Sequence, residues 1–596
     1  MINLNLTWTL YILMRWAAIG RWVVTSAWPY INSVPHLGNM VGSVLSADVY
    51  ARFLRMLGED VVFVSGSDEH GTVIEVEARR RGVTPKELTD ISHEYILKLW
   101  EIWSISFDNY TRTENEVHKK FVQEFLMRIY ENGLIEEREQ TVPYCPRDNI
   151  YLPDRFIEGT CPYCGFEGAR GDQCDNCGRL LEPNQLVNPR CVLCGSAPVF
   201  KDRSHWFFRL DRLEGDILLW VSRHETLEEN VRNFTVSWIK TTGLTPRSLT
   251  RDNKWGIQAP FPGSSDKSIY VWFDALLGYV SATKEYFVKL GRESEWVRYW
   301  FEEGSRTAYF IGKDNIPFHA VILPALLMAT KEPYVLPTII SATEYLMYEG
   351  RKFSKSRRVG VWIDEALKII DNTDYWRYSL IRMRPEDKDT NFKWSEFVRF
   401  VNNELNDHIG NFIHRVLTLI HRFSDGVVQE ASITSDVDTD FSSFIKESWS
   451  SYVSLMRRAR LRDASEFIVR LGERGNQYVN AKAPWAKIKE DVEDVKTTLN
   501  LGFTATLTLA VMLYPITPSS ARRILSSLNV GIEGLVVKDN PLELVRLPHK
   551  ISRVEQVFTK LPQTLVKTLL SDDEREYFLE RVRSELNNER PEVLRF

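Results

Sequence analysis

The stretch DVVFVSGSDEHG, residues 60–71, joins an apolar run to a group of charged side chains. Its first half predicts a buried strand, and its second half places acidic residues at the carboxyl end of that strand. Upstream, RWVVTSAWPY (21–30) predicts another buried strand, and VGSVLSADVYARFLRMLG (41–58) predicts a helix that ends at a glycine. Strand, helix and strand in this order favour a parallel, doubly wound α/β sheet, whose ligands bind beyond the carboxyl ends of the strands.

The rest of the chain divides into a resumed sheet and a helical part. Strand-like runs return at SIYVWFDALLGY (268–279), TAYFIGKD (307–314) and YVLPTII (334–340), so we expect the first sheet to be interrupted and then resumed. From about residue 395, apolar residues recur every three or four positions, which predicts helices up to about residue 527. The stripe of the first helix consists of Phe397, Val401, Leu405, Ile409, Phe412, Val416 and Ile420.

The composition is that of an ordinary globular protein. The 596 residues are 44% hydrophobic and 26% charged, which excludes a disordered or membrane-embedded chain, and the length predicts two to four domains. The net charge of −5 excludes a general basic coat, so any RNA contact must depend on local patches. An apolar run near the start is interrupted by Arg15 and is too short to span a bilayer; we interpret it as an N-terminal extension, with Met14 as an alternative start.

A possible phosphate site follows the first predicted strand at Pro35-His36-Leu37-Gly38-Asn39. Backbone amides and the helix dipole favour anions at the start of a helix. The His36 imidazole and the Asn39 amide can both donate to phosphate oxygens, and Gly38 leaves room for a flat base. The chain has neither a G-x-x-x-x-G-K-[ST] loop nor a G-x-G-x-x-G motif, so a nucleotide would be held in this other way. Taken alone, a histidine here is more often a helix cap or a packed ring.

A second group of cations lies far along the chain, at Lys352-Phe353-Ser354-Lys355-Ser356. Glycines at 350 and 360 flank it, which is typical of a loop. The ammonium groups of Lys352 and Lys355 can neutralise charge that develops on a phosphate in a transition state. Taken alone, the segment is more often a solvated basic turn.

Together, HLGN and KFSKS resemble the HIGH and KMSKS signatures of class I aminoacyl-tRNA synthetases, in the same order and with a wide separation. The resemblance implies a Rossmann-type catalytic domain that binds ATP with Mg²⁺. It implies that ATP is bound by His36, Gly38, Asn39 and Lys355. It also implies that the catalytic residues are His36, Asn39, Lys352 and Lys355, with Lys355 stabilising the pentavalent phosphorus. Asn39 departs from the usual histidine of the fourth position and keeps a neutral donor there.

All seven cysteines fall between residues 145 and 194, which is the pattern of a metal site in a reducing compartment. Two C-x-x-C-G knuckles supply four thiolates, the set that a tetrahedral structural zinc prefers: Cys161, Cys164, Cys174 and Cys177. A second zinc would use Cys145, Asp148, Cys191 and Cys194. Asp148 is equally well explained as an ordinary surface carboxylate, so the sequence predicts one or two structural zinc ions.

The segments around these motifs resemble methionyl-tRNA synthetases of the archaeal type over residues 21–547: SAWPY, GSDEHGT, LPDRF, YVWFDALLGY, FIGKDNIPFH and KAPW. The resemblance implies that ATP, L-methionine and tRNA(Met), initiator and elongator, give methionyl-tRNA, AMP and diphosphate through methionyl-adenylate. By resemblance the methionine site consists of Tyr30, Asp68, Trp272, Tyr279, Phe318 and His319. Without it, the aromatic residues would be interpreted as core. Trp28 and Leu276 depart from the usual leucine and proline, which leaves the detailed shape of the pocket open.

The helical part is expected to bind the anticodon. Asn411 and Arg415 lie four residues apart, away from the apolar stripe, and the resemblance adds Trp485 of KAPW as a stacking residue for the CAU anticodon. The alternatives are a helix salt bridge and a core tryptophan. A run of arginines could contact backbone phosphates, although a solvated helix face explains it as well: Arg457, Arg458, Arg460 and Arg462.

These observations predict an α/β Rossmann-type class I synthetase domain with an inserted zinc-knuckle connective domain, followed by an all-α anticodon-binding domain. The expected divisions are an extension (1–20), a split catalytic domain (21–116 and 234–335), the connective insert (117–233), a KMSKS-loop and stem-contact region (336–394), the anticodon-binding domain (395–550) and a helical tail (551–596). Because no appended barrel follows, we expect a cytoplasmic monomer without membrane contact, or one assisted by a separate tRNA-binding protein. The rivals are a cysteine- or leucine-type synthetase, or a zinc-containing RNA-binding protein without catalysis.

Overall fold

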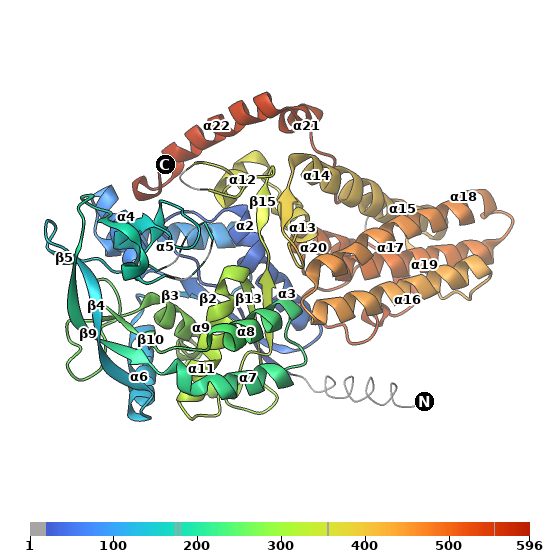
Figure 1. The fold of residues 1–596 in the computed structure, drawn as a ribbon. Coiled ribbons are helices and arrows are strands. Elements are labelled where there is room, and N and C mark those ends of the chain that lie inside the picture. Colours follow the sequence, from blue (N-terminus) through green and yellow to red (C-terminus); the bar gives the residue numbers. More distant parts are fainter. Residues whose placement is uncertain are drawn as a thin grey trace.

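A five-stranded parallel sheet forms the centre of the catalytic part (Figure 1). The computed structural model describes residues 20–595 except 173, 175, 178, 180, 355, 356, 553 and 554, so Met14 and Arg15 lie outside the described residues. The strand order is β14-β13-β1-β2-β3, and every neighbouring pair is parallel, which confirms the predicted doubly wound α/β sheet. The strands are β1 (Arg21–Ser26), β2 (Asp60–Ser67), β3 (Asn109–Arg112), β13 (Arg306–Gly312) and β14 (Ile339–Thr343).

Helices cover both faces of this sheet. Alternate residues of β1 point to opposite sides: Trp22 and Val24 belong to one hydrophobic core, and Val23 belongs to another. The first core contains α3, and the second contains α9. The helices of this part are α2 (Leu37–Asn39), η1 (Met40–Val44), α3 (Leu45–Met56), α4 (Thr72–Arg81), α5 (Pro85–Ile102), α6 (Glu116–Glu131), α9 (Val271–Lys289), α10 (Trp296–Trp300), η6 (Phe318–Ile322) and α11 (Leu323–Ala329).

One predicted strand is wrong, and another is displaced, since only Ile339 and Ile340 of YVLPTII lie in β14. In SIYVWFDALLGY only β12 (Ser268–Ile269) is extended, and it pairs with β11 (Thr250–Arg251) rather than with the central sheet. The rest of the run begins α9, whose first three turns are buried almost all round. A continuous apolar run has no period that distinguishes a buried helix from a buried strand. The error matters for the site, because α9 carries Trp272 and Tyr279 on one helix.

The insert consists of two small antiparallel sheets and two helices. One sheet has the order β10-β9-β4-β5 and the other the order β7-β6-β8. Cys145 and Cys191 end strands of these sheets, and the other five cysteines lie in the segments that connect the strands. The elements are β4 (Ile135–Cys145), β5 (Ile150–Tyr151), β6 (Ile157–Thr160), β7 (Ala169–Arg170), β8 (Val187–Cys191), β9 (Val199–Phe208), α7 (Glu214–Arg223), α8 (Glu229–Thr242) and β10 (Arg247–Ser248).

The helical part confirms the predicted stripe. Helices α14 (Trp394–Arg399), η7 (Phe400–Gly410) and α15 (Asn411–Ser424) run on without interruption, and all seven stripe residues are buried. They pack against α17 so closely that a Cβ at Gly475 would lie 2.5 Å from the Phe412 ring. The other helices are α16 (Asp436–Arg457), α17 (Leu461–Lys482), α18 (Pro484–Lys487), α19 (Val492–Leu513) and α20 (Pro518–Ser527).

Two further segments join the catalytic and helical parts. The first contains β15 (Leu346–Tyr348), α12 (Ile363–Ile369), α13 (Thr373–Arg382) and β16 (Thr390–Phe392). The second is the tail, in which α21 (Gln563–Leu570), α22 (Asp572–Glu589) and η9 (Glu592–Leu594) return across the catalytic part (Figure 1). Its buried Arg590 donates to both carboxylate oxygens of Asp364 in α12. Within the described residues, every helix is too short or too polar to cross a lipid bilayer.

Candidate functional site

The two motifs that resemble HIGH and KMSKS meet in space, although more than 300 residues separate them. Leu37 N donates to Val361 O at 3.0 Å, and Ile363 N donates to Pro35 O at 3.0 Å. The His36 ring stacks on Phe353 of KFSKS, with centroids 4.5 Å apart. Lys352 is exposed, whereas Lys355 lies outside the described residues.

His36 is both a helix cap and a candidate ligand. Its Nδ1 accepts a hydrogen bond from Asn39 N at 3.2 Å, and Asn39 Oδ1 accepts one from His36 N at 3.2 Å. An imidazole that accepts at Nδ1 carries its proton on Nε2 when it is neutral. The cap therefore fixes two donors, His36 Nε2 and the Asn39 amide nitrogen, at the carboxyl edge of the sheet. A cavity lined by both residues also reaches Tyr30.

The end of β2 places a carboxylate beside the segment that follows β1. Asp68 N donates to Pro29 O at 2.9 Å, which brings Tyr30 next to Asp68. The Asp68 side chain is 2% exposed, and no donor in the described part of the chain reaches its Oδ1. Burial, reinforced by the nearby Asp274 charge, raises the pKa of Asp68 well above its usual value. Such an acceptor is suited to a cationic ligand group, which would restore the ionised form.

Aromatic residues from α9 and η6 gather beside Asp68. Trp272 stacks on Phe318 with centroids 4.0 Å apart, and it meets Tyr30 in a T-shaped arrangement with centroids 6.2 Å apart. His319 Nδ1 donates to Asn315 O at 2.9 Å, so its Nε2 accepts from the Tyr279 hydroxyl at 2.7 Å. Burial lowers the pKa of His319 to about 4, which keeps the ring neutral. All six residues predicted for the methionine site therefore lie in one region.

Sequence reasoning missed the charged network behind Asp68. Asp274 of α9 accepts from His70 Nδ1 at 2.6 Å and from His118 Nε2 at 2.5 Å. His70 Nε2 also contacts Glu114 at 2.8 Å. Although burial alone would lower the pKa of His70, Asp274 and Glu114 raise it to about 10, so the ring is cationic. The available signal was Asp274, a lone charged residue in the apolar run YVWFDALLGY, whereas His70 lies among other polar residues in GSDEHGT.

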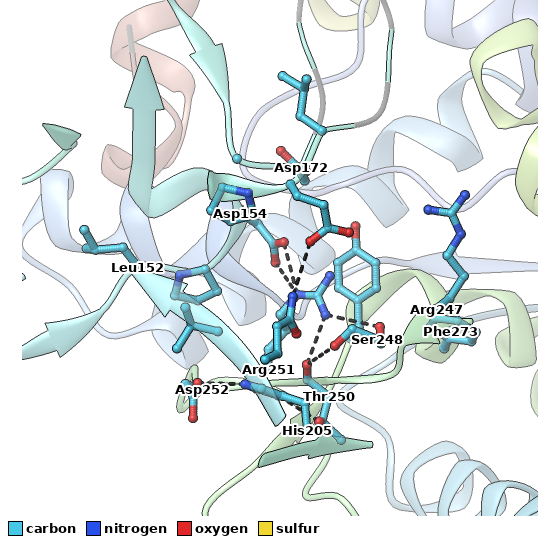
Figure 2. A pocket seen from close by; sticks show the side chains of 18 of the residues that line it. Leu152, Asp154, Asp172, His205, Arg247, Ser248, Thr250, Arg251, Asp252 and Phe273 are labelled. Carbon is cyan, nitrogen blue, oxygen red and sulfur yellow. Dashed lines mark hydrogen bonds and ion pairs between the residues drawn. The ribbon is translucent and has the colours of Figure 1, made fainter. Parts of the chain in front are cut away.

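A second cavity lies between the insert and residues 247–252 (Figure 2). Arg251 Nε donates to Asp154 at 3.1 Å, and its guanidinium lies 3.7 Å from the centroid of Tyr270. On the same wall His205 contacts Asp252 at 3.0 Å. Phe318 lines this cavity as well, so it borders the aromatic cluster. Arg251 was not predicted, because the burial of Asp154 that requires a counter-charge is seen only in the structure.

The cysteines form two groups, as the predicted pairing of knuckles requires. Four thiols come together from the inner knuckles: Cys161, Cys164, Cys174 and Cys177. The outer pair brings together Cys145, Asp148, Cys191 and Cys194. Within each group the ligand atoms lie within 4.8 Å of one another, a spacing compatible with one tetrahedral ion. Four thiols in the first group, and three thiols with one carboxylate in the second, are ligand sets that zinc accepts. The protein supplies all four ligands of each group, so neither site leaves a coordination position for a substrate.

The helical part presents the predicted RNA-facing residues together. Asn411 is exposed at the start of α15, and Arg415 follows one turn later. The Arg415 guanidinium lies 4.8 Å from the ring centroid of Trp485, which is 44% exposed and therefore not a core residue. In the arginine run, Arg457 pairs with Glu59 and Arg460 pairs with Asp387, so ion pairs account for these two side chains.

Comparisons with known proteins agree with this geometry. Residues 22–417 match the family described as tRNA synthetases class I (M), and residues 428–584 match the anticodon binding domain of methionyl tRNA ligase. The chain is similar to a methionine-tRNA ligase of Sulfurisphaera tokodaii, with 53% identity over 96% of this chain and 99% of the relative. It is also 53% identical to one from Aeropyrum pernix, over 97% of this chain and all of that protein.

Solved structures agree as well. The methionyl-tRNA synthetase of Mycobacterium tuberculosis in complex with methionyl-adenylate is 25% identical, covers 90% of this chain and 99% of its own, and superposes with a TM-score of 0.74. The parallel sheet, the meeting of HLGN with KFSKS and the helical part define a class I aminoacyl-tRNA synthetase. Within that class, the chain belongs to the methionyl-tRNA synthetases.

Proposed function

We propose that this chain activates L-methionine with ATP and transfers it to tRNA(Met), releasing diphosphate and then AMP. The observation that carries the proposal is the contact of His36 with Phe353, which closes the HLGN and KFSKS segments around one edge of the sheet. The near-complete coverage of methionine-tRNA ligases supports the same reaction. Methionyl-adenylate is the intermediate, as in the complex formed by the Mycobacterium enzyme.

ATP is placed by donors at the start of α2. His36 Nε2 and the Asn39 amide donate to the triphosphate, and Gly38 lets the base approach the backbone. Lys352 and Lys355 bring positive charge to the α-phosphate as it becomes pentavalent. Mg²⁺ bound with ATP supplies further charge neutralisation at the phosphates.

Methionine binds between Asp68 and the aromatic cluster. The Asp68 carboxylate accepts from the substrate ammonium, which lowers the pKa of Asp68 again and returns it to the ionised form. The side chain enters the slot formed by Tyr30, Trp272 and Phe318, where a flexible thioether makes favourable contacts with rings. The hydrogen bond from Tyr279 to neutral His319 closes this slot without placing a charge in it.

The two cysteine groups hold structural zinc. Cys161, Cys164, Cys174 and Cys177 supply four thiolates, and hydrogen bonds led by the Phe166 backbone lower the pKa of Cys164 to about 6. The second group has three thiolates and Asp148, so a full site uses aspartate as its fourth ligand. Both ions would fix the fold of the insert, which lines the cavity next to the aromatic cluster.

Asn411, Arg415 and Trp485 read the anticodon of both initiator and elongator tRNA(Met). An exposed indole beside a guanidinium offers an unstacked base a stacking surface and hydrogen-bond donors. The protein acts in the cytoplasm as a monomer or with a separate tRNA-binding protein, and the domain limits given above remain predictions. A sedimentation mass twice that of the chain would contradict the monomer.

The experiment that tests the reaction is methionine-dependent exchange of labelled pyrophosphate into ATP. The chain should exchange with methionine and not with cysteine or leucine, which distinguishes it from other class I synthetases. Lys355→Ala should lose about 3 kcal/mol of transition-state stabilisation or more in adenylate formation. Equal rates for the two proteins would remove Lys355 from the mechanism, and no exchange with any amino acid would favour the non-catalytic RNA-binding alternative.

A further inference from the structure

A buried cluster of charged side chains stands three residues before Trp485. Lys482, the last residue of α17, is only 3% exposed. Its ammonium lies 2.9 Å from Asp438 in the first turn of α16 and also contacts Asp494 in the first turn of α19. The Tyr478 hydroxyl donates to Asp438 at 2.7 Å. One lysine therefore joins the ends of three helices.

The charges of this cluster balance one another. Asp438 also accepts from the hydroxyl of Ser435 at 2.7 Å. Although burial alone would raise the pKa of Asp438, hydrogen bonds from Tyr478 and Lys482 lower it to about 2, so the carboxyl is ionised at neutral pH. A buried carboxylate that loses its cation is left uncompensated, which destabilises the arrangement that held it.

The ion pairs of this cluster lie on both sides of the turn that carries Trp485. After Lys482, Ala483 adopts φ 43° and ψ 56°, a left-handed conformation that costs free energy for a residue with a Cβ. Pro484 then starts α18. Beyond Trp485, Lys487 pairs with the second oxygen of Asp494 at 2.9 Å. Asp494 thus forms ion pairs with Lys482, which precedes Trp485 in the chain, and with Lys487, which follows it.

Strained turns persist only where the surrounding structure fixes them. Of the two lysines, Lys487 is 42% exposed, so water screens its pair and weakens it. Lys482 is buried and contacts both aspartates, so it contributes most to holding the turn. Because it is buried, Lys482 cannot itself reach an RNA base.

We propose that Lys482 is a positioning residue for tRNA recognition. Its ion pairs with Asp438 and Asp494 hold the turn at Ala483 so that the Trp485 indole projects beside Arg415. The inference rests on the proposed anticodon role of Trp485 and deepens it, because it identifies what keeps the indole in place before tRNA arrives. The Lys482 ammonium thus affects tRNA binding at a distance from the RNA.

The test compares Lys482→Met with wild type in the full-length protein. We measure methionine-dependent pyrophosphate exchange, and kcat/KM for charging tRNA(Met) and a tRNA with an altered anticodon. Exchange should stay within about twofold, while kcat/KM for tRNA(Met) falls at least about tenfold through KM, the loss expected of a misplaced stacking residue. Discrimination against the altered anticodon should fall as well. Lys482→Arg, which keeps the charge, should regain most of the charging rate.

Two further variants make the result specific. Lys487→Met removes the exposed lysine of the cluster and should charge within about twofold of wild type. In a Lys482→Met background, Trp485→Ala should add less than about a twofold loss, because the indole is already misplaced. If Lys482→Met does not accumulate as folded protein, Asp494→Asn is measured by the same criteria.

Each outcome decides the inference. Normal charging by Lys482→Met, or a proportionate fall of exchange and charging, overturns the positioning role; the second result would mean a general structural role. Normal charging by Trp485→Ala alone instead overturns the anticodon assignment on which the inference rests. The two failures are distinguishable because they come from different single variants.

Discussion

The buried Arg377 of α13 predicts a large loss of stability on substitution with methionine. Its guanidinium donates to Asp48 of α3 at 2.6 Å, to Trp103 O at 3.0 Å and to Ile516 O at 2.8 Å. Arg377 and Asp48 are both fully buried. One side chain therefore joins the helix that follows HLGN, the end of α5 and the turn between α19 and α20 of the helical part.

The magnitude follows from what Arg377→Met leaves behind. Methionine fills a similar volume, so little cavity is created. Asp48 loses one of its two cations, and three backbone carbonyls lose a donor: those of Trp103, Pro515 and Ile516. Breaking a buried pair in this way costs about 3 to 5 kcal/mol. Although burial alone would raise the pKa of Asp48, Arg52 and Arg377 lower it to about 2. A carboxyl whose folded pKa is depressed stabilises the fold above its unfolded pKa of about 3.9 and loses that contribution as the pH falls.

The assay is urea unfolding of wild type and Arg377→Met between pH 7 and pH 2, followed through the first transition because a protein of several domains is not two-state. The variant should unfold at lower urea at pH 7, and the difference should shrink as the pH falls through about 4 toward 2. Arg292→Met, which removes an exposed pair with Glu295, is the matched control and should show no measurable change. Equal midpoints for wild type and Arg377→Met at pH 7, or a difference that grows in acid, would refute the reasoning.

Three further predictions concern the other parts. Trp485→Ala should weaken tRNA charging by about 1 to 3 kcal/mol with methionine-dependent exchange retained, and a proportionate fall in both would contradict the anticodon assignment. Metal analysis should find two zinc ions per chain in wild type and one in Asp148→Ala; two ions in the variant would show that Asp148 is not a ligand. Gly475→Ala should destabilise the helical part by about 1 to 3 kcal/mol in thermal unfolding, because its Cβ would lie 2.5 Å from the Phe412 ring, and an unchanged midpoint would mean that the ring moves away freely.

The sequence was sufficient for the first strands of the sheet, because short apolar runs there flank an amphipathic helix, and for the stripe of the helical part, because its apolar residues recur every three or four positions. It failed at SIYVWFDALLGY, where a helix buried on all sides shows no period at all. Motifs also predicted individual candidate ligands, such as His36 and Asp68. They did not reveal Arg251 or Arg377, whose carboxylate partners, Asp154 and Asp48, are more than 90 residues away. Pairings of that kind depend on tertiary contacts, which one sequence does not show.

Asp68, the carboxylate proposed to bind substrate, has fewer hydrogen bonds than the three carboxylates described above that hold the fold, although Glu69 and Asp374 also have one buried oxygen without a donor in the described part of the chain. Asp48, Asp274 and Asp438 are buried, and each accepts from at least two donors of the chain itself. Asp68 is equally buried, yet its Oδ1 has no donor in the described part of the chain. A buried acceptor without a donor raises the free energy of the folded state, because its lost hydrogen bonds to water are not replaced. Binding of an ammonium group at Asp68 would supply the missing donor. Because Asp68 also lies next to Tyr30 of the aromatic cluster, the two observations together are the reason to place the methionine amine there.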